Sequence, residues 1–293
     1  MISLVLAIAT AAVWGTADFC GGKASQRAPA LTVSVWSKTA SLPVLAVALA
    51  VAPGRPDPAS LGWGALGGLF GMAGVILLYR GLALGAMTIV APVTAVTSAL
   101  VPFAVGMVTD GTAGLWPTVG AACAIAAIAL VSTGPGSTGP GGDRSVVRAG
   151  VVGLALAAGT GFGLFMTFLS RAGDDAGLWP LTTAQAAALL LGFGLLSRAR
   201  PRDLGRFRAP FHTESSKITG ILTVLAGVLD LSANVLYLYA THTGGPLTIV
   251  APLASLYPAS TVLLALAVDR EKIRPLQLAG LGLAATALVL VAG

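Results

Sequence analysis

Polar and charged side chains inside apolar runs are the residues of this sequence that could carry chemistry. Asp230 lies in the middle of the apolar run 218–240, followed by Asn234 and Tyr237. In a helix, residues three or four apart share a face, so these three form one polar stripe. A carboxyl group is costly in an apolar helix and well suited to exchange a proton. The stripe predicts a site for a polar solute or a proton; a buried structural hydrogen bond is the alternative.

Two further charged residues occur near each other in the first two apolar runs. Asp18 lies near the end of the first run, and Lys38 lies about two turns into the second. The loop between them is short, so we expect both at a similar depth, where they could form an ion pair. Such a pair either stabilises packing or lines a site. Trp14 and Trp36 are candidate cavity walls, with packing or an interfacial position as the alternative, and Gln185 is another polar residue within a run.

The elements that position these residues follow from composition and length. Of 293 residues, 56% are hydrophobic and only 10% are charged, against roughly 25% charged in soluble domains. The apolar runs have the length of about 20 residues that a helix needs to cross a bilayer. We therefore predict an all-α polytopic membrane protein, in a bacterial inner (plasma) membrane, with ten transmembrane helices. The predicted spans are 2–21, 31–52, 61–80, 86–108, 115–133, 149–170, 178–197, 218–240, 246–268 and 275–292.

The second half of the chain repeats part of the first. The pentapeptide Thr88–Pro92 recurs 160 residues later as Thr248–Pro252, and the register continues without a gap from 79 to 131. Equivalent spans are five apart, an odd number, so they must cross the membrane in opposite directions. This pattern predicts two inverted five-helix repeats, as in many secondary transporters. The expected units are 1–133, a Gly/Pro/Ser-rich linker at 134–148, and 149–293.

Prolines interrupt equivalent spans in the two repeats. Pro92 and Pro102 fall in the fourth span, and Pro252 and Pro258 in the ninth. A proline inside a helix frees a carbonyl and kinks the chain. Because interrupted helices at corresponding places point to a central binding site, Pro92 and Pro252, which match in register, mark that site, with Tyr257 beside it.

Glycine pairs at GxxxG spacing occur in two spans, at Gly67 and Gly71 and at Gly159 and Gly163. Small residues at this spacing let two helices approach closely in lipid. Close packing is therefore the favoured interpretation, and backbone exposed to a substrate path is the alternative.

The basic residues are unevenly distributed between the two sets of loops. Arg55 and Arg171 lie in loops on one side, and Lys38 lies within a span. By the positive-inside rule, the opposite, basic side is cytoplasmic and both termini face outward. The basic segment 198–217 is interpreted as a topology anchor in contact with acidic headgroups, so no nucleic-acid partner is expected. The basic side holds Lys23, Arg27, Arg80, Arg144, Arg148, Arg198, Arg200, Arg202, Arg206, Arg208, Lys217, Arg270, Lys272 and Arg274.

Motifs for enzymes, cofactors and metals are not found in the sequence. Cys20 and Cys123 are isolated in apolar runs and form neither a disulfide framework nor a metal site. The sequence also lacks an HExxH motif, a paired-aspartate metal motif and a nucleophile elbow. We therefore expect neither an enzyme nor a resident cofactor.

Several motifs resemble those of EamA-type proteins in the drug/metabolite transporter superfamily. They are Trp14-Gly15 followed by Lys23, the segment from Tyr79 through Ala91-Pro92 to Gly120, Tyr257-Pro258, Asp269-Arg270-Glu271, and Gln277 to Gly280. The resemblance covers both halves and implies ten helices around a central cavity and transport of small metabolites by alternating access. Asp110 departs from the glutamate expected there, which the second repeat has as Glu271. Many members have cytoplasmic termini, contrary to the orientation that the charges predict.

The function that these observations predict is secondary active transport of a small metabolite, an amino acid-like, organic or drug-like solute, with a coupling proton and membrane lipids as the expected partners. A non-transporting or lipid-handling membrane component with the same fold is the alternative. The candidate substrate- or ion-binding residues are Asp230, Asn234, Tyr237, Asp18, Lys38, Trp14, Trp36, Pro92, Pro252 and Tyr257.

Overall fold

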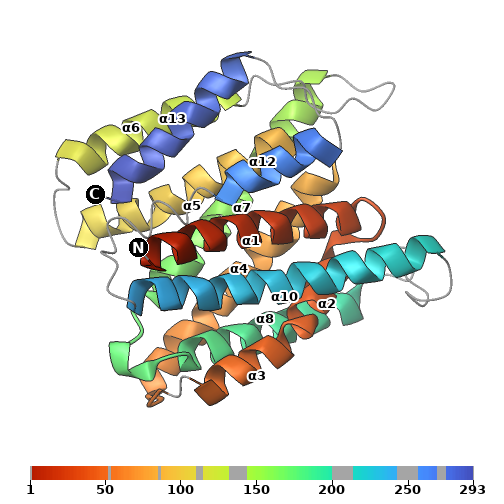
Figure 1. Ribbon diagram of the computed structural model, residues 1–293, viewed down its shortest axis with the longest axis vertical. Coiled ribbons are helices and arrows are strands. Elements are labelled where there is room, and N and C mark those ends of the chain that lie inside the picture. Colours follow the sequence, from red (N-terminus) through yellow and green to blue (C-terminus); the bar gives the residue numbers. More distant parts are fainter. Residues whose placement is uncertain are drawn as a thin grey trace.

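The computed structural model (Figure 1) describes residues 2–51, 54–84, 87–109, 115–131, 144–199, 214–242, 257–268 and 275–292. Throughout these ranges the regular structure is helical, with no strand, which confirms the predicted all-α class. The helices are α1 (Ile2–Ser25), α2 (Ala30–Ala40), α3 (Leu42–Val51), α4 (Pro58–Ala83), α5 (Met87–Thr109), α6 (Leu115–Val131), α7 (Arg144–Leu169), the 3-10 turn η1 (Asp174–Ala176), α8 (Trp179–Arg198), α10 (Glu214–His242), α12 (Tyr257–Val268) and α13 (Pro275–Ala292).

Seven segments of the described chain are long and apolar enough to cross a membrane. They lie in α1, in α2 and α3 taken together, and in α4, α5, α7, α8 and α10. They account for seven of the ten predicted spans. Shorter apolar helices, α6, α12 and α13, occupy the described parts of the other three.

The second predicted span is divided at Ser41 into α2 and α3, whereas the sequence predicted one continuous helix. Pro43 explains the division, because it has no N–H to donate and its ring clashes with the carbonyl of Thr39. The amide group of Gln185 on α8 donates to the carbonyl of Lys38 at 2.7 Å and to the hydroxyl of Ser41 at 2.7 Å. A partner helix thus satisfies the polar groups at this kink.

Helices from the two ends of the chain pack against each other. Helix α1 contacts α10, α12 and α4. Helix α4 contacts α7 and α8. Helix α7 also packs against α5, and α10 against α2. At the top of Figure 1, α6 lies beside α13. The interior is therefore built from residues far apart in the sequence.

Glycines set the closest of these contacts. A Cβ atom at Gly159 would collide with Thr97 on α5, and one at Gly163 would collide with Val101. This confirms the close packing predicted for that GxxxG pair. The other predicted pair, Gly67 and Gly71 on α4, faces Phe165 of α7 at a looser spacing.

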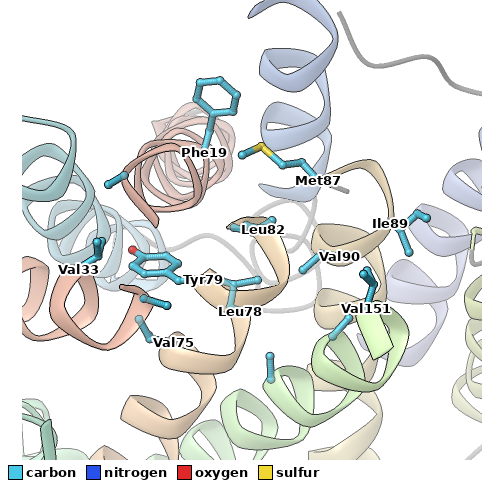
Figure 2. Close-up of a cluster of buried hydrophobic side chains, with 14 of the residues drawn as sticks. Phe19, Val33, Val75, Leu78, Tyr79, Leu82, Met87, Ile89, Val90 and Val151 are labelled. Carbon is cyan, nitrogen blue, oxygen red and sulfur yellow. The ribbon is translucent and has the colours of Figure 1, made fainter. Parts of the chain in front are cut away.

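A buried apolar cluster fills the region between α1, α2, α4, α5 and α7 (Figure 2). Leu82 and Val90 are fully buried near its centre, and Tyr79 points from α4 toward Val33. By contrast, Val47, Leu190 and Leu263 are exposed on the outside, where a membrane helix faces lipid.

The connection before α4 is joined to the connection before α8 and to the first residue of α8 by hydrogen bonds to main-chain carbonyls. The amide of Arg55 donates to the carbonyl of Asp175 at 2.8 Å. The indole N–H of Trp179 donates to the carbonyl of Gly54 at 3.2 Å. The connection before α4 and the connection before α8 thus meet at the same end of the bundle.

Helix α4 begins at this junction with a side-chain cap. A carboxylate oxygen of Asp57 accepts the amide of Ser60 at 2.9 Å. Hydrogen bonds from Ser60 hold the pKa of the Asp57 carboxyl below its ordinary value. The hydroxyl of Ser60 in turn accepts the amide of Gly173 at 2.9 Å, so the cap also binds the neighbouring connection.

Candidate functional site

A cavity of about 280 Å³ lies between the helices and is lined by residues of α1, α2, α4, α5, α7, α8, α10 and α12. Most of its wall is apolar. Three charged side chains reach it: Asp18 from α1, Lys38 from α2 and Asp230 from α10. An apolar cavity with a few convergent polar groups is the usual form of a small-molecule site.

Lys38 and Asp230 form an ion pair in this cavity. The Lys38 Nζ lies 2.9 Å from the Asp230 Oδ2. The side chains retain 19% and 31% of their exposed surface, respectively, so the cavity side of the pair is open. The pair joins the first and second halves of the chain, since its partners are 192 residues apart.

A glycine brings the two partners within reach. Gly227 lies one turn before Asp230 on α10, and a Cβ atom there would collide with the carbonyl oxygen of Ser37. Ser37 directly precedes Lys38. The absence of a side chain at Gly227 therefore lets α10 lie close to α2 at the position of the ion pair. A larger residue at 227 would separate the two helices.

The polar stripe on α10 lies along the cavity. Asp230, Asn234 and Tyr237 all contribute to its wall. The Asn234 side chain, however, donates to the main-chain carbonyl of Asp230 at 2.7 Å, not to its carboxylate. Asn234 therefore leaves the Asp230 carboxylate available to Lys38.

The sequence suggested that Asp18 and Lys38 could form an ion pair. The structure does not show this pair, because Lys38 is paired with Asp230. Asp18 still lines the cavity. In the part of the chain that the structure describes, the only salt bridge that involves Lys38 or Asp230 joins them to each other. The short loop between α1 and α2 did put Asp18 and Lys38 at one cavity, but α10 comes closer to Lys38 than α1 does.

Three aromatic side chains gather beside Asp18. Trp14 lies one turn before Asp18 on α1, and its ring centroid is 5.9 Å from that of Tyr237 and 6.0 Å from that of Tyr257. All three line the cavity. This cluster, defined as Trp14, Tyr237 and Tyr257, is contributed by α1, α10 and α12.

Helix α12 is held against α1 near this cluster. A Cβ atom at Gly15 would collide with the side chain of Ser260. The Ser260 hydroxyl donates to the carbonyl of Ala11 at 2.8 Å, and that of Thr261 donates to the carbonyl of Gly15 at 3.0 Å. These contacts fix Tyr257, the first residue of α12, beside Trp14.

The structure places the remaining predicted site residues elsewhere. Trp36 is 46% exposed and lies outside the cavity wall, because two residues of helix turn it to nearly the opposite side from Lys38. Pro92 is buried but does not line the cavity, whereas Pro102 of the same helix does. Pro252 lies outside the described residues. Seven of the ten candidates line the cavity: Trp14, Asp18, Lys38, Asp230, Asn234, Tyr237 and Tyr257.

Sequence reasoning missed most of the apolar wall. Phe162 and Phe165 of α7 line the cavity, as do Ala184 and Ala188 of α8. The small residues at i and i+4 on α8 are the signal that could have identified that face. Nothing comparable distinguishes the two phenylalanines from other apolar residues of α7.

Comparison with known proteins identifies a family. No curated protein matches the chain significantly. The model of the EamA-like transporter family matches residues 1–133 and 149–293, which is nearly the whole chain. We conclude that this chain is an integral membrane protein and belongs to the EamA-like transporter family of the drug/metabolite transporter superfamily.

Proposed function

We propose that the protein is a secondary active transporter that moves a small metabolite, an amino acid-like, organic or drug-like solute, across the membrane by alternating access coupled to protons. The observation that carries this proposal is a mostly apolar cavity whose wall contains the Lys38–Asp230 ion pair. Its walls come from both segments that match the family.

The proposed architecture is ten spans in two inverted five-helix repeats, 1–133 and 149–293, joined by a linker at 134–148. The helix contacts support it. When each helix is replaced by its counterpart in the other repeat, a pair of helices in contact becomes another pair in contact. The pair α4–α7 corresponds to α10–α1, α5–α7 to α12–α1, and α4–α8 to α10–α2, while α6 packs against its own counterpart, α13. Helices α1 and α13 begin and end, respectively, on the same side in Figure 1, as an even number of crossings requires.

The ion pair supplies a route for proton coupling. When Asp230 binds a proton it loses its charge, and the electrostatic attraction that joins α10 to α2 at Lys38 is lost. Rearrangement of one repeat against the other requires contacts between them to break and reform. Protonation of Asp230 would therefore favour states in which these two helices separate.

The membrane and orientation are also proposals. We place the protein in a bacterial plasma membrane with both termini outside, on the distribution of Lys and Arg in the sequence. Single cysteines added at each terminus of a variant lacking Cys20 and Cys123, labelled from outside intact cells, test this orientation. Labelling only after the cells are opened would contradict it.

Reconstitution in liposomes tests the transport function. Purified protein is screened for uptake of amino acids, organic acids, nucleosides, sugars and organic cations, with and without a pH gradient. We expect flux of one solute class that the gradient increases, and loss of this increase in Asp230→Asn. Asp57→Asn, which changes a carboxylate outside the cavity, is the matched control and should behave like the wild type.

Two outcomes would contradict the proposal. Unchanged gradient dependence in Asp230→Asn would remove Asp230 from proton coupling. No flux of any class from folded, monodisperse protein, together with full protection of a single cysteine beside Asp230 from water-soluble thiol reagents, would instead favour the non-transporting or lipid-handling alternative.

A further inference from the structure

The charges of the cavity do not balance, and this imbalance bears on the substrate class of the proposed transporter. Lys38 and Asp230 neutralise each other at 2.9 Å. The carboxyl group of Asp18 remains, and no other described residue of the wall is acidic or basic. When Asp18 is ionised, the cavity has one negative charge in excess, in surroundings where an unpaired charge is costly, and a bound cation would offset that cost.

The basic group of the cavity is already paired. Lys38 is the one cation of the described wall, and its ammonium donates to the Asp230 carboxylate at 2.9 Å. Ser98, Gln185 and Asn234 also line the wall, and each donates a hydrogen bond to a main-chain carbonyl, at 2.8, 2.7 and 2.7 Å. An anionic group would therefore compete with Asp230 for its counter-ion, whereas a cation would meet the Asp18 carboxyl.

The aromatic cluster lies next to that carboxylate. Trp14 and Asp18 are four residues apart on α1, so they share a face and lie about 6 Å apart at their Cβ atoms. Tyr237 and Tyr257 extend the cluster around Trp14. Aromatic faces attract organic cations, and tryptophan does so most strongly. The carboxylate and the rings thus form a binding site for the same kind of group.

The apolar part of the wall suits an apolar body. Phe162, Phe165 and Met72 line the cavity together with small residues of α4 and α8. Few polar groups are available there to replace the hydration of a sugar or a polyanion. The volume of about 280 Å³ lies near the lower end of small-molecule sites.

We propose that the cavity binds a monovalent organic cation with an apolar body, its positive group between the Asp18 carboxylate and the Trp14 cluster and its body against α7. This inference rests on the proposed transport function and names the substrate class. Asp18 and Trp14 act as binding residues, while Lys38 neutralises Asp230 so that the site accepts one positive charge.

Equilibrium binding to the purified protein tests the inference without requiring transport. The probe is benzyltrimethylammonium, compared with benzenesulfonate as an anion of similar size and phenylalanine as a zwitterion. We expect the cation to bind most tightly. Asp18→Asn should weaken it about tenfold or more, and Trp14→Leu roughly 3- to 30-fold.

Matched variants separate these effects from misfolding. Asp57→Asn removes a carboxylate outside the cavity, and Trp63→Leu removes a tryptophan that stacks on Phe168, also outside it; neither should change cation affinity. If Asp18→Asn does not fold, Asp18→Glu and Trp14→Leu replace it, with affinity retained in the first and reduced in the second.

The outcomes distinguish this inference from the transport proposal. Wild-type cation affinity in Asp18→Asn, or tighter binding of benzenesulfonate or phenylalanine than of the cation, would overturn the inference and leave transport of another solute intact. Asp18-dependent cation binding without flux in liposomes would support the site and contradict the transport function.

Discussion

The ion pair between Lys38 and Asp230 can be tested by a double-mutant cycle. Lys38→Met leaves Asp230 and Asp18 as two uncompensated carboxylates in one apolar cavity, and Asp230→Asn leaves the Lys38 ammonium without its partner. The double variant removes both charges together. We expect each single variant to be less stable than the wild type, and the double variant to recover most of the loss.

The magnitude follows from the geometry. Two unit charges 2.9 Å apart attract by about 6 kcal/mol at an effective dielectric constant of roughly 20. The two side chains remain 19% and 31% exposed, and solvent screening reduces that value. We therefore expect a coupling energy of about 1–3 kcal/mol, below the 3–5 kcal/mol or so for breaking a fully buried pair.

Thermal unfolding of the four proteins in one detergent measures the cycle. For a chain of this size, 1 kcal/mol corresponds to roughly 2–3 °C in Tm, so each single variant should fall by about 2–8 °C. A control cycle of Lys38→Met with Asp57→Asn should be additive, because Asp57 caps α4 outside the cavity. Additive effects of Lys38→Met and Asp230→Asn would refute the reasoning.

Three further predictions concern the residues around this pair. Gly227→Ala should destabilise the protein by about 1–3 kcal/mol and reduce the coupling of the ion pair, because its Cβ meets the carbonyl of Ser37; Gly62→Ala, which meets nothing within 4 Å, is the control, and equal Tm changes in the two would contradict this. Gln185→Leu should cost about 1–2 kcal/mol in thermal unfolding, because the acceptors at the kink between α2 and α3 lose their donor; a Tm equal to wild type would show that the kink needs no partner. The Asp57 carboxyl has a lowered pKa when folded, so its charge stabilises the protein above the unfolded pKa of about 4, and this contribution is lost as the pH falls through the folded pKa. Tm measured against pH should therefore fall more steeply below about pH 4 in the wild type than in Asp57→Asn, which keeps the cap without the charge, and parallel curves would argue against it.

The sequence predicted those features that depend on local periodicity. Composition and run length gave the all-α membrane class, and helical spacing placed Asp230, Asn234 and Tyr237 on one wall of the cavity. Trp14 and Asp18 line it too, since they are one turn apart. These inferences need only the geometry of a single helix.

The features that depend on contacts between distant helices were not predictable in this way. The partner of Lys38 is determined by the approach of α10 to α2 at Gly227, which no single run of sequence shows. The choice between Pro92 and Pro102 depends on which face of α5 meets the cavity. Trp36 was misplaced for a simpler reason, because it lies on the side of α2 away from Lys38.

The division of charge between the two family segments constrains how such a protein can be taken apart. Lys38 and Asp18 belong to the first segment and Asp230 to the second. A homodimer of the second segment alone would bring two Asp230 carboxylates to the centre without an ammonium, and one of the first would bring two Lys38 ammonium groups and two Asp18 carboxyl groups without Asp230. Only the heterodimer of the two fragments restores the native charge pattern, so complementation between separately expressed fragments requires one of each kind.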